Sequence, residues 1–367
     1  MGLRTIGNWR HIFLAAALIS GLAACGGNDI DTRTTVRSIT VFGDSLSDVG
    51  TYQVATGSSS NPGKFTINPG TIWVDNIASF YGLKLSPNRS LTMDKDASGG
   101  ATTAVGTATV IGGNGYAEGG ARVSQLPSES GVGNNQLVAP VSQQVTNYLA
   151  AHGNFPGNEL VVIDGGTNDV YAQFDAVCWG GDDNGVGAGN TTMETATAAV
   201  AKAANDLVAQ VKRIKASGAQ IVLVSGAFDW SVSPFGRQYL TSAYQSTGCA
   251  TPVPATQITN WSTQFNSIVS QGVAGIPGVV FYNFSSTLTG IAAAPSSYGF
   301  TNVTDQACTN QTPTNSAAFC TTSTIASPDA AQTYLFSDAF HPTPHGHKVV
   351  SDAALAALGT VAKPINQ

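Results

Sequence analysis

Residues 38–48 read SITVFGDSLSD, a short β-branched and aromatic run that ends at a glycine and continues into polar residues. The run predicts a strand, and Gly43 predicts a sharp turn at its carboxyl end. Residues 159–169 read ELVVIDGGTND, a buried-strand pattern that is again followed by glycines and polar side chains. Two strands of this kind predict that the polar groups gather at one edge of a sheet, outside the strand ends.

Strand and helix patterns alternate along the rest of the chain. The further strands are predicted at residues 220–225 and 279–284, and the helices at 71–83, 138–151, 191–216, 258–273 and 345–361. Repeated β–α units favour one parallel sheet with helices on both faces. Stretches rich in small polar residues are interpreted as loops that decorate a single domain: 57–70, 94–114, 179–190 and 292–328.

The composition excludes several classes of protein. Charged residues make up 10% of the 367 residues, hydrophobic residues make up 42%, and the net charge is −6. This hydrophobic content is too high for a disordered chain, and the 41 glycines show no fixed period of the collagen kind. The acidic balance and the lack of a basic run argue against a nucleic-acid partner.

The first 24 residues are typical of a secretory signal. Two arginines precede an apolar run at residues 12–24, which is too short to span a bilayer as a helix. The run leads into LAAC at 22–25, which resembles the lipobox of bacterial lipoproteins. We therefore expect Cys25 to be acylated, residues 25–37 to form a tether, and the protein to be an outer-membrane lipoprotein of the cell envelope. A secreted protein with an ordinary cleavage site and an incidental cysteine is the alternative.

Four cysteines remain besides Cys25, and four cysteines allow three pairings. We favour Cys178–Cys249 and Cys308–Cys320, because each pair brackets a segment rich in Gly, Ser, Thr and Asn. Disulfides are typical of an oxidising compartment. Because they close loops in the unfolded chain, these two would stabilise the folded state by about 4 and about 3 kcal/mol. Four buried free thiols are the alternative, and the absence of C-x-x-C spacing argues against a zinc or thioredoxin-like site.

Side chains that can carry chemistry follow the predicted strands. Ser45 comes after the first strand, where a turn at Gly43 can expose its hydroxyl. The same residues are also typical of a capped helix start, which is the alternative interpretation. Asn168 follows the second strand, where its amide can donate to an oxyanion or simply belong to a turn. Asp338 stands three residues before His341, so its carboxylate can orient the imidazole through Nδ1 and leave Nε2 free as a base.

Elimination leaves His341 as the candidate base for a serine nucleophile, which generally needs one. His11 lies in the predicted signal, His152 has no acid just before it, and of the three C-terminal histidines His341 has an Asp at the right offset. A metal cluster of His341, His345 and His347 is a weaker alternative, because two prolines interrupt the run and no H-E-x-x-H motif occurs. We expect His347 to be a supporting or helix-capping residue.

The sequence resembles the SGNH, or GDSL-type, serine esterases and lipases. Four blocks occur in the order of that family: VFGDSLSD at 41–48, YAEGGA at 116–121, GTND at 166–169 and DAFHPT at 338–343. No G-x-S-x-G motif occurs, which argues against an α/β-hydrolase. The resemblance implies a three-layer α/β/α, flavodoxin-like sandwich with a mostly parallel central sheet, formed by a single domain at residues 38–362.

The resemblance also implies a role for each of five residues. Ser45 would be the nucleophile, His341 the base and Asp338 the acid that orients it. The backbone N–H groups of Ser45 and Gly120 and the side chain of Asn168 would form the oxyanion hole. The expected activity is hydrolysis of small-molecule or lipid carboxylic esters through an acyl-enzyme, with no metal or organic cofactor.

Departures from the family pattern leave the substrate open. Gly115 stands where Asn is common, and Pro69-Gly70 stands where Asn-Gly is common, although residues 65–83 resemble the subgroup of GDSL lipases, autotransporter esterases and lecithinase-type acyltransferases. An acyltransferase with an alcohol acceptor and a non-catalytic, surface-tethered binding lipoprotein are the alternatives. Three aromatic residues in predicted loops suit either an apolar acyl group or ordinary packing: Trp179, Trp230 and Phe235.

Overall fold

The structure is a computed structural model that describes residues 31–95, 101–128, 137–179, 191–309 and 316–365. Its chain contacts separate residues 1–32 from residues 33–367, and the second of these units is described below. The predicted signal at 1–24 and the predicted lipidation site Cys25 lie outside the described residues.

Four parallel strands form the central sheet in the order β2 (Ser38–Phe42), β5 (Glu159–Ile163), β6 (Ile221–Val224) and β7 (Val279–Phe281). Residues 114–116 extend it beyond β2, where the Val41 N–H donates to the Asn114 carbonyl at 3.1 Å and the Tyr116 N–H donates to the Val41 carbonyl at 2.7 Å. Numbered along the chain, these five segments stand in the order 2-1-3-4-5. This is the flavodoxin-like order, so the predicted fold class is confirmed.

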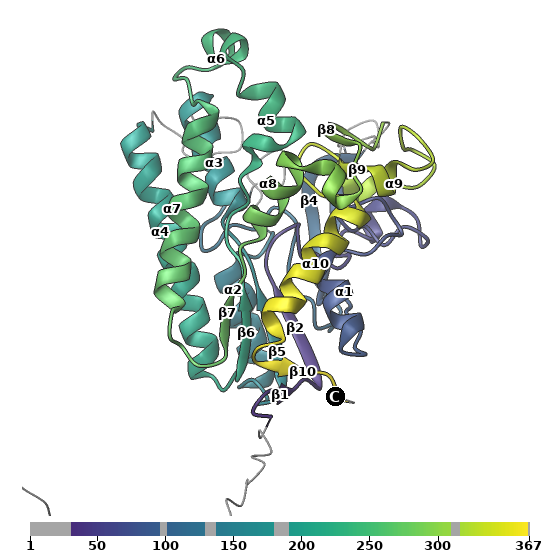
Figure 1. Cartoon of the computed structure of the whole chain (residues 1–367), viewed down its shortest axis with the longest axis vertical. Coiled ribbons are helices and arrows are strands. Elements are labelled where there is room, and N and C mark those ends of the chain that lie inside the picture. The colour runs from purple at the N-terminus through teal and green to yellow at the C-terminus, as the bar shows by residue number, and fades with distance from the viewer. Residues whose placement is uncertain (1–30, 96–100, 129–136, 180–190, 310–315, 366–367) are drawn as a thin grey trace, which may run out of the picture. The chain divides into compact units, whose positions relative to one another are not determined.

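Helices cover both faces of the sheet. On one side α4 (Met193–Ala216) packs against α2 (Val141–His152) and α7 (Ala255–Val273), and on the other α10 (Pro344–Leu358) packs against α1 (Trp73–Phe80) and α8 (Phe284–Ala293). Figure 1 shows α4 and α7 to one side of the strands and α1 and α10 to the other. Because both faces are covered, β5 and β6 are buried along their whole length, which explains their continuous hydrophobic sequences.

Local signals account for the helix ends. The Thr192 hydroxyl accepts the Thr195 N–H at the start of α4, and Arg213 and Lys215 lie in its last turn, where cations suit the helix dipole. Gly218 then leaves the helix at φ 106°. These features were visible in the sequence, so the predicted helix at 191–216 differs from α4 by two residues at one end.

Three predictions of irregular or turn structure are corrected. Residues 94–114, expected to be a loop, contain most of an antiparallel hairpin of β3 (Arg89–Lys95) and β4 (Ala101–Val110). Residues 292–328, also expected to be a loop, contain β8 (Asn302–Gln306), which pairs with β9 (Tyr334–Phe336). The GTND block, for which a turn was one interpretation, begins α3 (Thr167–Cys178).

The remaining elements are short. β1 (Thr34–Thr35), which falls within the predicted tether, pairs in parallel with β10 (Ala362–Lys363). The others are η1 (Val54–Thr56), η2 (Trp230–Val232), α5 (Pro234–Tyr239), α6 (Ser242–Gly248), η3 (Pro295–Tyr298), η4 (Ala317–Phe319) and α9 (Ala330–Thr333). Within the described ranges, none of the helices combines the length and the hydrophobicity that crossing a bilayer requires.

Both favoured disulfides are present. Cys178 at the end of α3 is bonded to Cys249 just after α6, and Cys308 is bonded to Cys320 just after η4. Their Cα–Cα separations are 4.3 and 6.0 Å. The pairing prediction is therefore confirmed, and two disulfides are typical of proteins that leave the cytosol.

Candidate active site

Ser45 lies in the turn that follows β2. The Leu46 N–H donates to Asp44 Oδ1 at 3.0 Å, and the Ser47 N–H donates to the Asp44 carbonyl at 3.1 Å, so the backbone folds back immediately after the strand. The Ser47 hydroxyl in turn receives the Trp73 Nε1–H at 3.0 Å, which ties the turn to α1. These contacts hold Ser45 at the carboxyl end of the sheet.

Three side chains from distant parts of the sequence form one hydrogen-bonded chain. His341 Nε2 lies 2.8 Å from Ser45 Oγ, and His341 Nδ1 lies 2.8 Å from Asp338 Oδ2 and 2.9 Å from Asp338 Oδ1. A carboxylate beside Nδ1 favours the tautomer with the proton on Nδ1, which leaves Nε2 to accept the Ser45 hydroxyl. The structure thus brings the three candidate triad residues into direct contact.

Backbone donors fix the carboxylate of Asp338. Its Oδ1 accepts the N–H groups of Phe340 at 2.9 Å and His341 at 2.8 Å, and its Oδ2 accepts the Ala317 N–H at 2.7 Å. Burial alone would raise the pKa of Asp338, but the charge and hydrogen bonds of His341 and the N–H of Phe340 outweigh burial. The pKa of Asp338 therefore lies below its ordinary value, and the carboxylate is ionised beside His341.

The block at residues 116–121, called the Gly block below, lies against the turn that carries Ser45. The Glu118 N–H donates to the Gly43 carbonyl at 3.2 Å, and the Thr51 hydroxyl donates to the Ala117 carbonyl at 3.2 Å. Gly120 itself has a φ of 85°, a conformation in which glycine is preferred. The blocks at 41–48 and 116–121 are therefore joined directly, although they are distant in the sequence.

Asn168 lies in the first turn of α3 and reaches the same block. Its Nδ2 donates to the Ala121 carbonyl at 3.0 Å. A carboxamide nitrogen carries two hydrogens, so this bond orients the side chain and leaves the second hydrogen for another acceptor. The structure thus places Asn168 beside the residue that follows Gly120.

Two buried carboxylates support the Gly block, and the sequence reasoning missed their role. Asp48 Oδ1 accepts the N–H groups of Gly50 at 2.9 Å and Thr51 at 2.7 Å, and its Oδ2 accepts the Gly119 N–H at 2.9 Å. Glu118 forms an ion pair with Arg89 of β3 at 2.8 Å and accepts the Ala139 N–H at 2.8 Å. Burial raises the pKa of Glu118 to about 7, against the opposing charge of Arg89.

A third carboxylate holds the start of α3. Asp169 accepts the Val123 N–H at 2.9 Å and pairs with Arg122 at 3.6 Å, and both of these charged side chains are buried. Burial raises the pKa of Asp169, while the charge of Arg122 opposes that shift. Asp169 therefore links the turn that carries Asn168 to the segment just after Gly120.

Asp44 and Asp164 form a buried carboxyl pair behind Ser45. Gly43 lies so close to this pair that a Cβ there would stand 1.7 Å from Asp164 Oδ1. Burial raises the pKa of Asp44 to about 6, and burial together with the charge of Asp44 raises the pKa of Asp164 further. The two carboxyl groups interact directly, so their titrations are coupled and both pKa values lie above the ordinary value of an aspartate.

The other C-terminal histidines have structural surroundings. His345 stacks on Phe300, with ring centroids 4.5 Å apart, and its Nδ1 contacts the Gln332 carbonyl. His347 is completely buried in α10, and burial lowers its pKa to about 3, so its ring is neutral. In the described part of the chain, no group of three or more His, Cys, Asp or Glu side chains is arranged to hold a metal ion.

Aromatic rings flank His341. Phe65 lies against the imidazole, with centroids 4.9 Å apart, and Phe340 stacks on Phe235 at 4.5 Å. Of the three aromatic residues singled out from the sequence, Trp230 is fully buried, Phe235 is 9% exposed and Trp179 is half-buried. Ordinary packing therefore accounts for Trp230, whereas Phe65 and Phe340 are the rings next to His341.

Residues 39–354 match the GDSL-like Lipase/Acylhydrolase family, and the chain belongs to that family. Family membership makes it a hydrolase that acts on esters in the general sense, with small-molecule esters as the class of substrate. Among curated proteins, no significant match was found. Among solved structures, the chain is similar to LAE5, an alpha/beta hydrolase enzyme from the metagenome of Lake Arreo, Spain, with 13% identity, a TM-score of 0.41, and coverage of 90% of this chain and 98% of that chain. No functional assignment is based on this similarity.

Proposed function

We propose that the protein is a serine-dependent carboxylic ester hydrolase whose triad is Ser45, His341 and Asp338. The observation that carries the proposal is the continuous contact from Ser45 Oγ through both nitrogens of His341 to the Asp338 carboxylate, at 2.8 Å on each side. Membership of an acylhydrolase family supports an ester as the substrate. The class is esterase or lipase.

In this proposal, Ser45 Oγ attacks the ester carbonyl while His341 Nε2 takes its proton. His341 then protonates the leaving alcohol, and a water molecule deprotonated by His341 hydrolyses the acyl-enzyme. Asp338 holds the imidazole in its tautomer and stabilises the imidazolium that forms. The ionised state of Asp338 supports this role, because a neutral acid would stabilise the imidazolium far less.

The oxyanion of the tetrahedral intermediate would be bound by the backbone N–H groups of Ser45 and Gly120 and by the Asn168 side chain. Two features support this assignment: the second amide hydrogen of Asn168 and the direct contacts that join the three blocks. Such donors act without reorganisation when they are fixed before the reaction. Asp48, Glu118 and Asp169 supply that fixation here.

We further propose that the protein is exported and tethered through an acylated Cys25. The two disulfides support export. Mass spectrometry of the N-terminal peptide from the native host tests the tether. A diacylglyceryl cysteine at position 25 that Cys25→Ala abolishes is expected, and an unmodified N-terminus at another residue would contradict it.

Hydrolysis of p-nitrophenyl esters from C2 to C16 tests the activity. The chain from Gly26 onward, which contains the whole of residues 33–367, would be assayed beside its Ser45→Ala variant. We expect a serine-dependent signal, and its chain-length optimum would distinguish an acetyl-esterase from a lipase. Adding acceptor alcohols to the same assay measures any acyl transfer. Full activity of the Ser45→Ala variant would contradict the assignment.

A further inference from the structure

Asp338 receives one of its hydrogen bonds from outside its own turn. Phe340 and His341, which donate to Oδ1, belong to the turn that Asp338 begins. Oδ2, which also lies beside His341 Nδ1, accepts the Ala317 N–H at 2.7 Å from a segment 21 residues earlier. The orientation of the carboxylate therefore depends on where that earlier segment is held.

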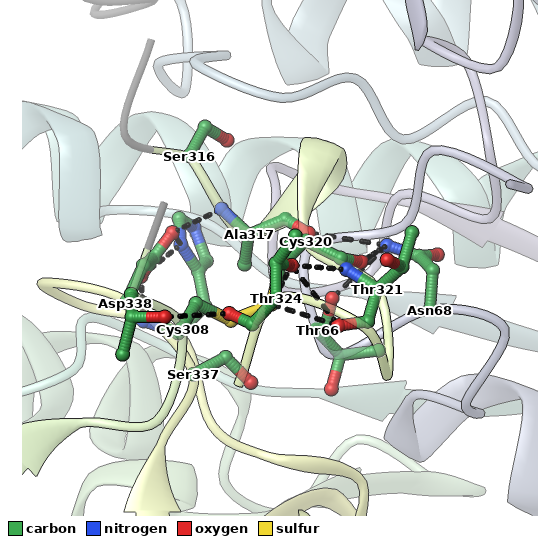
Figure 2. The surroundings of a disulfide bond; sticks show 12 residues. Thr66, Asn68, Cys308, Ser316, Ala317, Cys320, Thr321, Thr324, Ser337 and Asp338 are labelled. Atoms are coloured by element: carbon green, nitrogen blue, oxygen red, sulfur yellow. Dashed lines mark hydrogen bonds and ion pairs between the residues drawn. A yellow bond between two sulfur atoms is a disulfide. The ribbon is translucent and has the colours of Figure 1, made fainter. Parts of the chain in front are cut away.

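A disulfide holds that segment against Asp338. Ala317 begins η4, the Cys320 N–H donates to its carbonyl at 3.0 Å, and Cys320 is bonded to Cys308. The Cys308 N–H in turn donates at 2.9 Å to the carbonyl of Ser337, the residue before Asp338. Figure 2 shows Ala317 and Asp338 joined by their hydrogen bond beside the disulfide.

Asn68 provides a second connection between the same groups. Its N–H donates to the Cys320 carbonyl at 2.9 Å, and its Nδ2 lies 3.1 Å from the Ala317 carbonyl. The Thr66 hydroxyl donates to the carbonyl of Pro342, the residue after His341, at 3.0 Å. Asn68, Ala317 and Cys320 are fully buried, so this network is shielded from water.

We propose that the Cys308–Cys320 disulfide is a positioning device for the catalytic acid: it keeps the Ala317 N–H on Asp338 Oδ2 and so fixes the carboxylate against His341 Nδ1. This inference rests on the triad proposed above. Opening the disulfide leaves Ala317 held by non-covalent contacts alone. Water then reaches Oδ2, and the carboxylate is free to turn away from the imidazole.

The expected effect is on the chemical step rather than on substrate binding. A small misplacement of a catalytic group costs up to about 100-fold in rate, so kcat should fall about 10- to 100-fold while KM changes less than about threefold. Water around Asp338 also screens its attraction for the imidazolium. The acidic limb of the kcat/KM profile should therefore move to lower pH. Asp44 and His347 also interact electrostatically with His341.

The second disulfide provides a matched control, because Cys178–Cys249 joins the end of α3 to the residue after α6. The Cys178→Ala/Cys249→Ala variant, made in the chain from Gly26 onward, retains Cys308–Cys320 as its one disulfide. We expect this variant to keep the kcat and the pH profile of the parent protein. Its activity must also be lost with Ser45→Ala. If it is not, the proposed function fails independently of this inference.

Dithiothreitol is then titrated into that control variant. It supplies two electrons and two protons to the disulfide and leaves as a cyclic disulfide, and free thiols, kcat, the pH profile and near-UV circular dichroism are followed together. We expect kcat to fall in proportion to the thiols formed, with the dichroism retained, and to recover on reoxidation. Full reduction with unchanged kcat and pH profile would overturn the proposal, and so would a loss of activity that follows a loss of near-UV signal. Cys308→Ala/Cys320→Ala should reproduce the reduced state.

Discussion

At the scale of single residues, the proposed mechanism distinguishes groups that would react from groups that would hold them in place. Ser45, His341 and Asp338 are in direct contact, whereas Asn168 is oriented through the Ala121 carbonyl. A donor of this kind acts only when negative charge develops on the substrate oxygen. Its removal should therefore change the rate of the chemical step more than the binding of the substrate.

Asn168→Ala tests that expectation. Loss of one oxyanion donor typically lowers kcat about 10²- to 10³-fold, and KM should change far less. Steady-state kinetics on the best p-nitrophenyl ester measure both constants. Asn205→Ala is the control, because Asn205 is exposed on α4. A rise in KM at constant kcat would show that Asn168 binds the substrate in its ground state instead.

Local sequence patterns pointed to the three candidate triad residues, which the structure brings into contact, but not to the carboxylates that support the surrounding segments. Asp338 and His341 stand three residues apart and Ser45 follows a strand, so local spacing revealed them. Asp48, Asp164 and Glu118 act through partners that are distant in the sequence, and a buried acid looks like an exposed one until those partners are known. Their roles depend on tertiary contacts, which no local pattern encodes.

At the scale of secondary structure, the predicted strands and long helices agree with the structure because their apolar periodicity is strong. The β3–β4 hairpin was missed because its strands, RSLTMDK and ATTAVGTATV, do not alternate regularly between apolar and polar residues. The helix α3 was missed because its first residues, Thr167-Asn168-Asp169, are also typical of turns.

Gly166 controls the connection from β5 to α3. It has a φ of 107°, and a Cβ there would lie 2.3 Å from the Phe265 ring. Gly166→Ala should lower the free energy of unfolding by about 2–5 kcal/mol, through backbone strain and overpacking. Gly153, at φ 78° with no atom near its Cβ position, is the control, and Gly153→Ala should cost about 1 kcal/mol. Equal losses in urea unfolding would contradict the packing argument.

Glu118 joins β3 to the Gly block, and its titration should appear in the pH dependence of stability. Its pKa is raised from 4.5 to about 7 in the folded protein, so between these values the unfolded chain has released a proton that the folded protein keeps. Stability contributed by protonated Glu118 is therefore present below about pH 4.5 and lost as the pH rises to about 7, by up to about 1.4 kcal/mol per pH unit.

The Glu118→Gln variant has no carboxyl group at position 118, so it neither binds nor releases a proton there. The free energy of unfolding, measured in urea from pH 4 to 8, should then fall less steeply with pH than in the parent protein. Glu194→Gln, at an exposed position in the first turn of α4, should leave the slope unchanged. Parallel curves for the Glu118→Gln variant and the parent protein would show that Glu118 titrates alike in the folded and unfolded chains.

At the scale of the whole domain, the site lies where the strand order reverses. β2 is flanked by residues 114–116 on one side and by β5 on the other, so the connections after these strands leave the sheet in opposite directions. Ser45 follows β2, Gly120 follows residues 114–116, and Asn168 follows β5. Three of the four family blocks therefore meet because of the topology of the sheet.

The fourth block reaches the site from the end of β9, outside the central sheet. Alternating strand and helix patterns predicted a parallel sheet, but not how residues 302–343 would return to it. The contacts of Cys308 with Ser337 and of Ala317 with Asp338 fix the position of residues 337–341 beside Ser45. Cysteine spacing suggested the pairing, whereas its connection to Asp338 required the three-dimensional structure.

Covalent labelling with a fluorophosphonate tests the central claim most directly, because it requires an activated serine but not the natural substrate. Intact mass and peptide mapping of the chain from Gly26 onward should show one adduct per molecule, located on Ser45. Ser45→Ala should abolish the adduct, and His341→Ala should slow its formation by orders of magnitude. No adduct on folded protein, an adduct on another residue, or labelling at an unchanged rate without His341 would contradict the account.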